Sequence, residues 1–287
     1  MTLHTHIFIL LKIFLKVIIL WMDKITKVEL PRKNQIHNYF VASDWHSFHL
    51  NKACYHTLLR HAKHFDKKDR RLIINGDFLD IWYFMKKNEM FKKWVKRSDG
   101  IDEFFLPHWE EEVEWGNNTL DEIQDVFSTV IFISGNHDKP RTDFFQSICP
   151  VGYKDNFNYA SSLNLSKRGI EFIDYNNWLD IGNLSITHGM FHGSSAHKKH
   201  YEASGCRSVI YGHIHHDDKI SFMSRGHTKQ IHSLPAMCDL NPDYIRNSET
   251  NWTNGYMNVL MRHDGDFNAY TYTMWNDKIV DPYGNII

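Results

Sequence analysis

The chain has 287 residues, of which 42% are hydrophobic and 23% charged, and its formal net charge is -1. The length fits one large domain or two small ones, and the composition is typical of an ordinary soluble globular protein. A net charge this close to zero excludes a global field that would draw the protein to nucleic acid or to anionic lipid.

The four cysteines, Cys54, Cys149, Cys206 and Cys238, are widely separated and form no CxxC pair. This spacing indicates neither a zinc ribbon nor a disulfide framework. We therefore expect a reducing, cytoplasmic compartment.

Residues 7–21 form an apolar run that is interrupted by Lys12 and Lys16. A membrane-spanning helix needs about 20 apolar residues, so this run is short, and it lacks the small-residue cleavage site of a secretory signal. An interfacial helix is an alternative, because the two lysines would share one helical face. Since an ordinary polar start follows Met22, we expect residues 1–21 to be an upstream extension or a dispensable tail, and 22–287 to form the domain.

Five short apolar runs are predicted to be buried strands, because they are rich in β-branched and aromatic residues and end at turn residues. They cover residues 39–42, 72–74, 130–133, 184–187 and 208–211. Helical spacing of apolar residues predicts a helix over 50–65, between the first two strands. After residue 228, antiparallel strands are predicted over 230–234, 256–262 and 268–274, and the turn Asp264-Gly265 is a hairpin signal between the last two.

Each of the five strands leads into a segment of polar residues. The segments are Asp44-Trp45-His46, Gly76-Asp77-Phe78-Leu79-Asp80, Gly135-Asn136-His137-Asp138, His188-Gly189 and Gly212-His213-Ile214-His215. Open α/β sheets bind ligands at the carboxyl ends of their strands, so we expect the segments to converge. Their carboxylate and imidazole groups suit Mn, Fe, Zn or Co, and the absence of cysteine argues against a structural zinc. Two cations a few ångströms apart would account for this collection.

The spacing of residues within two of the segments allows both residues of a pair to bind the same ion. Asp44 and His46 lie two residues apart, so on an extended strand end both side chains can reach one ion. His213 and His215 repeat this spacing. For Asp80 two interpretations remain, a hydrogen bond to a ligand or a cap on a following helix.

In this order, the segments resemble the calcineurin-like metallophosphoesterase superfamily, whose pattern is D-x-H, G-D-x-x-D, G-N-H-D/E, H and G-H-x-H. The resemblance spans residues 44–215 and implies an α/β fold, a four-layer αββα sandwich with two central sheets and outer helices. It implies two divalent metal ions, with Mn²⁺ first and Fe, Zn or Co as alternatives. The implied ligands are Asp44, His46, Asp77 and His215 for the first ion, and Asp77, Asn136, His188 and His213 for the second.

The resemblance also implies a reaction in which a metal-activated hydroxide attacks phosphorus. His137 resembles the general acid that protonates the leaving oxygen, and Asp138 would orient His137. Arg141 is a candidate for binding a substrate phosphate, because guanidinium geometry suits that task, and a plain surface arginine is the alternative.

Residues 84–128 exceed the length of a simple crossover, and we expect a helical insertion that lies over the site. A basic cluster at 86–97 could grip a polyanion, with Phe91 and Trp94 stacking on bases. We favour a solvated helix face, because acidic residues follow and the net charge is near zero.

Departures from known subgroups bear on the substrate. Phosphoprotein phosphatases usually carry arginines after the second aspartate and before G-N-H, where this chain has Ile81 and Ser134. Lipid A-pathway pyrophosphohydrolases typically carry G-N-R-D, and repair nucleases add a DNA-binding cap. The chain looks most like small stand-alone bacterial and phage enzymes. We expect hydrolysis of a phosphodiester, or else of a phosphomonoester, and the alternatives are a DNA nuclease, a phosphoprotein phosphatase and a non-catalytic metal-binding scaffold.

Overall fold

The computed structural model describes residues 25–81, 105–148, 157–224, 226–242, 249–281 and 284–287. Its strands are β1 (Ile25–Lys27), β2 (Ile36–Ala42), β3 (Arg70–Asn75), β4 (Thr129–Ile133), β5 (Glu171–Ile173), β6 (Trp178–Ile181), β7 (Leu184–Thr187), β8 (Ser208–Tyr211), β9 (Asp218–Ser224), β10 (His227–Ser233), β11 (Asn254–Arg262) and β12 (Phe267–Met274). Its helices are η1 (Ser47–His49), α2 (Lys52–Ala62), η2 (Lys67–Asp69), α4 (Phe105–Val126), α5 (Lys139–Ile148), α6 (Tyr159–Ser162) and α7 (Ala196–Ala203). The expected extension at 1–21 and the basic cluster at 86–97 lie outside these residues.

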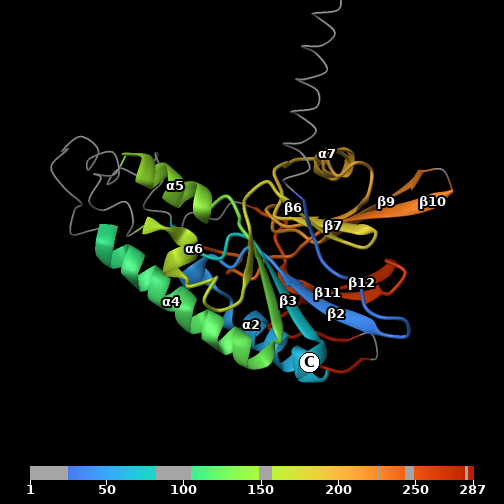
Figure 1. Cartoon of the computed structure of the whole chain (residues 1–287), viewed down its shortest axis with the longest axis horizontal. Helices are drawn as coiled ribbons and strands as arrows, with labels where there is room; N and C mark the ends of the chain where they lie inside the picture. Colours follow the sequence, from blue (N-terminus) through green and yellow to red (C-terminus); the bar gives the residue numbers. More distant parts are fainter. Residues whose placement is uncertain (1–24, 82–104, 149–156, 225, 243–248, 282–283) are drawn as a thin grey trace, which may run out of the picture.

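The strands form two mixed sheets of six strands each (Figure 1). The first sheet has the order β12-β11-β2-β3-β4-β5, in which β2 to β5 are parallel neighbours and β11 and β12 run antiparallel. The second sheet has the order β1-β6-β7-β8-β10-β9. The carboxyl ends of β2, β3 and β4 therefore share one edge of the first sheet, and those of the parallel pair β7 and β8 share one edge of the second.

Three buried clusters hold the layers together. Val41 and Ile73 from the first sheet pack with Ile186 and Ile210 from the second, so the two sheets face each other. The opposite face of the first sheet packs against α2 and α4, and the opposite face of the second sheet packs against α7. Figure 1 shows this succession of helix, sheet, sheet and helix. The expected four-layer αββα sandwich is confirmed.

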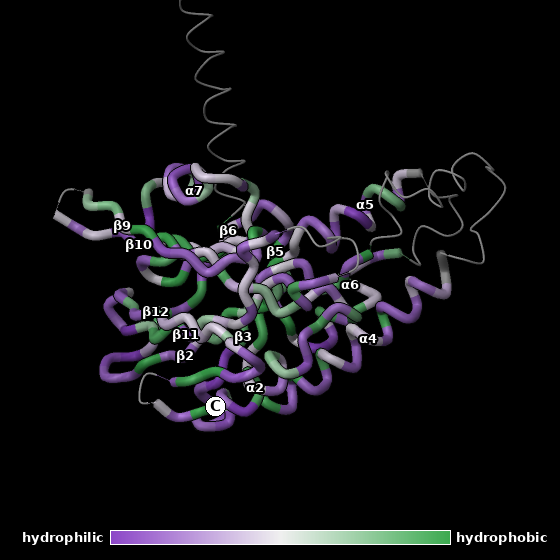
Figure 2. The backbone as a smooth tube through the Cα atoms, turned by 180° about the vertical axis from the view of Figure 1, so that it is seen from behind, coloured by the Kyte–Doolittle hydropathy of each residue, from purple (hydrophilic) through white to green (hydrophobic). Residues whose placement is uncertain are grey.

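Helix α4 is the part of the 84–128 stretch that the structure describes. Along its length hydrophobic and hydrophilic positions alternate (Figure 2), and Trp109, Leu120 and Ile123 are buried against the first sheet. This helix is thus a layer of the fold, and it borders the site through the buried Glu112. None of the helices in the described part of the chain is long and apolar enough to span a membrane.

The five predicted strands correspond to β2, β3, β4, β7 and β8, and the predicted first helix corresponds to α2. The predicted hairpin is β11–β12, where Gly265 adopts a φ of 84° that favours glycine. The segment at 230–234 was expected to join this antiparallel tail, but it belongs to β10 in the other sheet. There it runs parallel to β8 and antiparallel to β9.

Candidate metal centre

The five polar segments meet where strands of both sheets end. Oδ1 of Asp44, after β2, lies 3.2 Å from Nε2 of His215, after β8. Oδ2 of Asp77, after β3, lies 3.3 Å from Nε2 of His188, after β7. Backbone hydrogen bonds tie the turns together, from Asp44 N to Gly76 O at 3.0 Å and from Gly212 N to His188 O at 2.7 Å. The convergence expected from the strand ends is therefore present.

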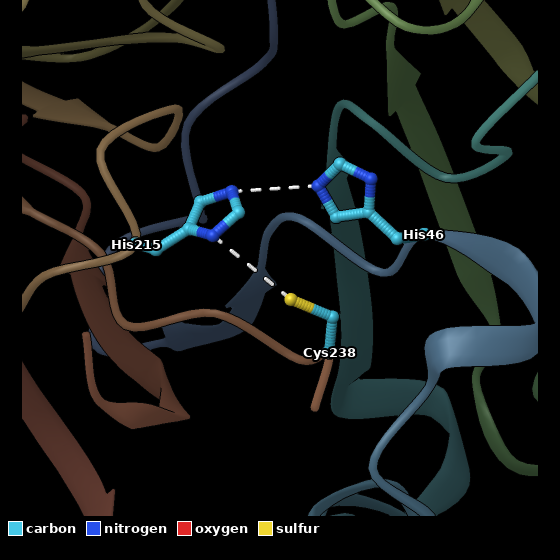
Figure 3. Close-up of side chains that lie close together, drawn as sticks. All are labelled: His46, His215 and Cys238. Carbon is cyan, nitrogen blue, oxygen red and sulfur yellow. Dashed lines mark hydrogen bonds between the residues drawn. The ribbon is translucent and has the colours of Figure 1, made fainter. Parts of the chain in front are cut away.

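The residues expected around the first ion lie in one buried group. Nε2 of His46 is 3.4 Å from Nε2 of His215, as Figure 3 shows, and 3.9 Å from Oδ2 of Asp77. Asp44 closes the group through its contact with His215. All four side chains are buried. Separations of this size between lone-pair donors fit ligands of a common cation.

The residues expected around the second ion form another group, which also includes Asp77. Nε2 of His188 is 3.1 Å from Oδ1 of Asn136 and 3.3 Å from Oδ2 of Asp77. Asp77, His188 and His213 each offer one donor atom, and these atoms lie within 4.8 Å of one another. Asp77 is therefore common to both groups.

An unsatisfied buried oxygen shows that the first group fits a cation. Oδ1 of Asp44 is fully buried, and in the described part of the chain it lies 3.2 Å from Nε2 of His215 without hydrogen-bond geometry, whereas Oδ2 accepts the His213 N–H at 3.0 Å. A buried carboxylate oxygen without a well-formed hydrogen bond is costly, and a divalent ion beside His215 would satisfy it.

Three of the expected histidine ligands are oriented in the same way by partners of their Nδ1 atoms. Nδ1 of His188 donates to the Asn75 carbonyl at 2.8 Å, and Nδ1 of His46 donates to Asp80 at 2.9 Å. Nδ1 of His215 faces Sγ of Cys238 at 4.0 Å (Figure 3). In each ring Nε2 is thus the atom that faces the centre, as metal-binding histidines require.

The backbone around the centre is strained. Five of the expected ligands have left-handed φ angles between 49° and 72°, namely Asp44, His46, Asp77, His213 and His215. Such angles are uncommon outside glycine and concentrate at functional sites. Gly135 is needed for close approach, because a Cβ there would lie 2.1 Å from Oδ1 of Asp77.

A sequence model of the calcineurin-like phosphoesterases matches residues 37–217. The chain belongs to this family. No curated protein matches this sequence.

Several solved structures are similar to this chain at low identity. Vps29 from Entamoeba histolytica complexed with Zn²⁺ is 12% identical, with a TM-score of 0.43 over 84% of this chain and 95% of that one. Vps29 from Cryptosporidium parvum is 11% identical, with a TM-score of 0.41 over 88% and 96%. The hypothetical protein PH1004 from Pyrococcus horikoshii is 9% identical, with a TM-score of 0.37 over 82% and 87%.

Opposite charges offset one another at the candidate metal centre. Burial opposes ionisation of Asp77, but the neighbouring His188 and His137 outweigh it and hold the pKa of Asp77 well below its usual range. Burial likewise disfavours a charged His188, but Asp77 raises its pKa to about 10. Burial also opposes a charged His46, but the hydrogen bond to Asp80 together with the negative charges of Asp77 and Asp80 raises its pKa to about 9. Protons on these histidines balance the carboxylates that cations would otherwise balance.

The position of His137 corrects the expectation about Asp138. Nδ1 of His137 is hydrogen-bonded to Oδ1 of Asp80 at 2.8 Å, so the orienting carboxylate is Asp80. Its Nε2 lies 4.0 Å from Oδ2 of Asp77, and the ring is partly exposed. Burial lowers the pKa of His137, although Asp77 and Asp80 oppose this shift.

Asp138 instead connects the turn that carries Asp77 with the turn that carries His137. Its buried carboxylate accepts backbone N–H groups of Phe78, Leu79 and Gly135 at 2.8–3.0 Å and the Tyr159 hydroxyl at 2.6 Å. The sequence could not show which of Asp80 and Asp138 orients His137, because each of them ends a ligand segment within a few residues of the expected ligands. Asp138 thus fixes the turn that carries Asp77 against the turn that carries His137.

Arg141 lies on α5 beside the centre. Its guanidinium donates to the backbone carbonyl of Asp80, and burial lowers its pKa. The role expected for Arg141 in phosphate binding stays a prediction.

Two residues outside the five segments also border the centre. Cys238 follows β10 and forms a group of possible donors with His46 and His215 (Figure 3). Trp252 precedes β11, and its ring centroid lies 4.2 Å from that of His215. Neither residue carries a local sequence signal, because both reach the centre only through the packing of the sheets.

Proposed function

We propose that the protein is a two-metal phosphoesterase that hydrolyses phosphodiesters. The observation that carries the proposal is the position of Asp77, whose Oδ2 lies 3.3 Å from His188 of one donor group and 3.9 Å from His46 of the other. A carboxylate shared between two histidine groups suits a bridging ligand. Family membership supports the same reaction class.

A bound pair of divalent ions would make a coordinated water more acidic and offset charge on the phosphoryl oxygens. In our proposal Asp44, His46 and His215 would hold one ion, Asn136, His188 and His213 would hold the other, and Asp77 would be a ligand of both. The Nδ1 hydrogen bonds of His46 and His188 keep Nε2 directed toward the ions.

His137 is proposed to deliver a proton to the leaving oxygen. With Nδ1 bound to Asp80 at 2.8 Å, Nε2 of the protonated ring is the atom able to donate. The lowered pKa of His137, which burial causes, makes its proton easier to give.

The preference for diesters is supported by the absence of arginine from the two positions where phosphoprotein phosphatases carry it. Ile81 stands at one of them and is fully buried in the core beside α2 and α4. A monoester dianion demands more positive charge than a diester monoanion does.

We propose Mn²⁺ as the working ion, because histidine and carboxylate ligands suit borderline ions. We also propose a stand-alone enzyme of the bacterial or phage type, placed in the cytoplasm because its cysteines are widely spaced.

The test is hydrolysis of bis-p-nitrophenyl phosphate by the purified chain with Mn²⁺ supplied, beside p-nitrophenyl phosphate, a phosphopeptide and linear DNA. We expect diester cleavage with two bound ions per chain and near-complete loss in Asp77→Asn. In His137→Ala we expect a large loss on a diester with an alcohol leaving group and a smaller loss on bis-p-nitrophenyl phosphate. Full activity of Asp77→Asn would reject the bridging role. Cleavage of phosphopeptides alone or shortening of DNA alone would replace the proposal by the corresponding alternative, and two bound ions without any turnover would favour a scaffold.

A further inference from the structure

Trp252 lies against a residue of the metal centre. Its ring centroid is 4.2 Å from that of His215, with the planes at 55° to each other. Nε2 of the same histidine lies 3.2 Å from Asp44 and 3.4 Å from His46. The indole is therefore separated from the first ion position by one imidazole ring.

Hydrogen bonds fasten the segment that carries Trp252 to the turn that carries His215. Thr253 N donates to the His215 carbonyl at 2.9 Å, and Thr253 Oγ1 accepts the Asp217 N–H at 3.0 Å. Nδ1 of His216 lies 2.7 Å from the Asn251 carbonyl. Residues on both sides of Trp252 are thus fixed, so the indole is pre-positioned at low entropic cost.

Core packing does not explain this tryptophan. Trp252 is partly exposed, and among the described residues it belongs to none of the three buried apolar clusters. A large aromatic side chain held beside a catalytic centre but outside the core is suited to bind a ligand by stacking.

We propose that Trp252 is the platform on which a planar aromatic group of the substrate stacks, so that the preferred phosphoester carries a nucleobase next to its phosphate. This inference rests on the proposed function and names the substrate class of that site. Stacking on an aromatic side chain needs no particular base and requires no positive surface, which agrees with the near-zero net charge.

The test is calorimetric binding to the Mn²⁺-loaded protein, with adenosine 5′-monophosphate and glycerol 3-phosphate as the probes. The two ligands share the phosphate and differ in the aromatic group. In Trp252→Leu we expect the ratio of the two affinities to fall about tenfold or more, and Trp252→Phe to restore most of it. Trp275→Leu is the matched control, because Trp275 is 70% exposed beyond the end of β12, and the ratio should stay unchanged.

An equal loss for both ligands in Trp252→Leu would overturn the inference, because Trp252 would then act only through His215. An unchanged ratio, or no adenosine 5′-monophosphate binding by the wild type, would overturn it as well. A 5′-phosphorylated single-stranded oligonucleotide distinguishes a strand end from a mononucleotide as the source of the base. Because binding needs no turnover, failure of diester hydrolysis would reject the proposed reaction separately from the stacking platform.

Discussion

Oδ1 of Asp80 lies 2.8 Å from Nδ1 of His137, and the same oxygen lies 2.9 Å from Nδ1 of His46. One carboxylate oxygen therefore orients an expected metal ligand and the proposed acid together. Burial disfavours the charged form, but the two histidines outweigh it and hold the pKa of Asp80 well below its usual range. The Asp80 N–H is fixed in turn by the Ser47 hydroxyl, which donates to Glu112 of α4 at 2.7 Å.

We expect Asp80→Asn to lower kcat about 100-fold or more on a diester with an alcohol leaving group, because His137 loses its charged partner. The loss should be smaller on bis-p-nitrophenyl phosphate, since p-nitrophenolate needs little protonation to leave. The measurement is kcat on both substrates, with the exposed Asp66→Asn as the control. Equal losses on the two substrates would contradict the assignment of His137 as acid.

The sequence predicted the convergence of the ligands because strand ends in parallel sheets share an edge. It left two interpretations for Asp80, of which the hydrogen bond to a ligand is present, and it gave the orienting role to Asp138, because left-handed turns such as the one at Asp77 decide where each carboxylate points. The short strands β5 and β6 and the edge strand β9 were not predicted, since three to seven residues without clear alternation give little pattern. Cys238 and Trp252 reach the centre through tertiary packing alone.

Gly135→Ala tests the close approach of two turns. A Cβ at this position would meet Oδ1 of Asp77 at 2.1 Å and its backbone N at 2.2 Å, so one turn must move. We expect at least a tenfold weaker affinity for Mn²⁺ and a loss of about 1–3 kcal/mol in the free energy of unfolding. Metal titration and urea unfolding measure both. In the control Gly205→Ala, where a Cβ meets nothing within 4 Å but the φ of 71° costs stability, metal affinity should be unchanged. Equal losses of metal affinity in both variants would refute the steric argument.

Cys238 is expected to position His215. Its buried thiol, whose pKa burial raises to about 12, is neutral and lies 4.0 Å from Nδ1 of His215. Loss of an outer partner commonly weakens metal binding, so we expect Cys238→Ala to lower the affinity for the first ion about tenfold and Cys238→Ser to retain it. Calorimetric titration with Mn²⁺ measures this, with the exposed Cys206→Ala as the control. Wild-type affinity in the alanine variant would show that Cys238 is only a packing residue.

His200 is expected to make stability depend on pH. Its Nε2 accepts the Met190 N–H at 3.1 Å and its Nδ1 donates to the Ala196 carbonyl at 2.9 Å, so the buried ring is neutral. Burial lowers its pKa from 6.5 to about 3. Below pH 6.5 the unfolded chain takes up a proton that the folded chain does not, so this contribution is complete above pH 6.5 and decreases as the pH falls toward 3.

Urea unfolding at pH 7.5 and 5.0 checks this sign. The slope from one such group is about 1.4 kcal/mol per pH unit. His200→Gln should therefore lose less free energy of unfolding on acidification than the wild type, whereas His227→Gln, at an exposed position, should behave as the wild type does. Identical acid dependence in His200→Gln and the wild type would contradict the prediction.

The most direct test of the account is an anomalous difference map from crystals grown with Mn²⁺. We predict two peaks, one on each side of the Asp77 carboxylate, the first bordered by Asp44, His46 and His215 and the second by Asn136, His188 and His213. A map with no peak, or with a single peak away from Asp77, would contradict a two-metal centre.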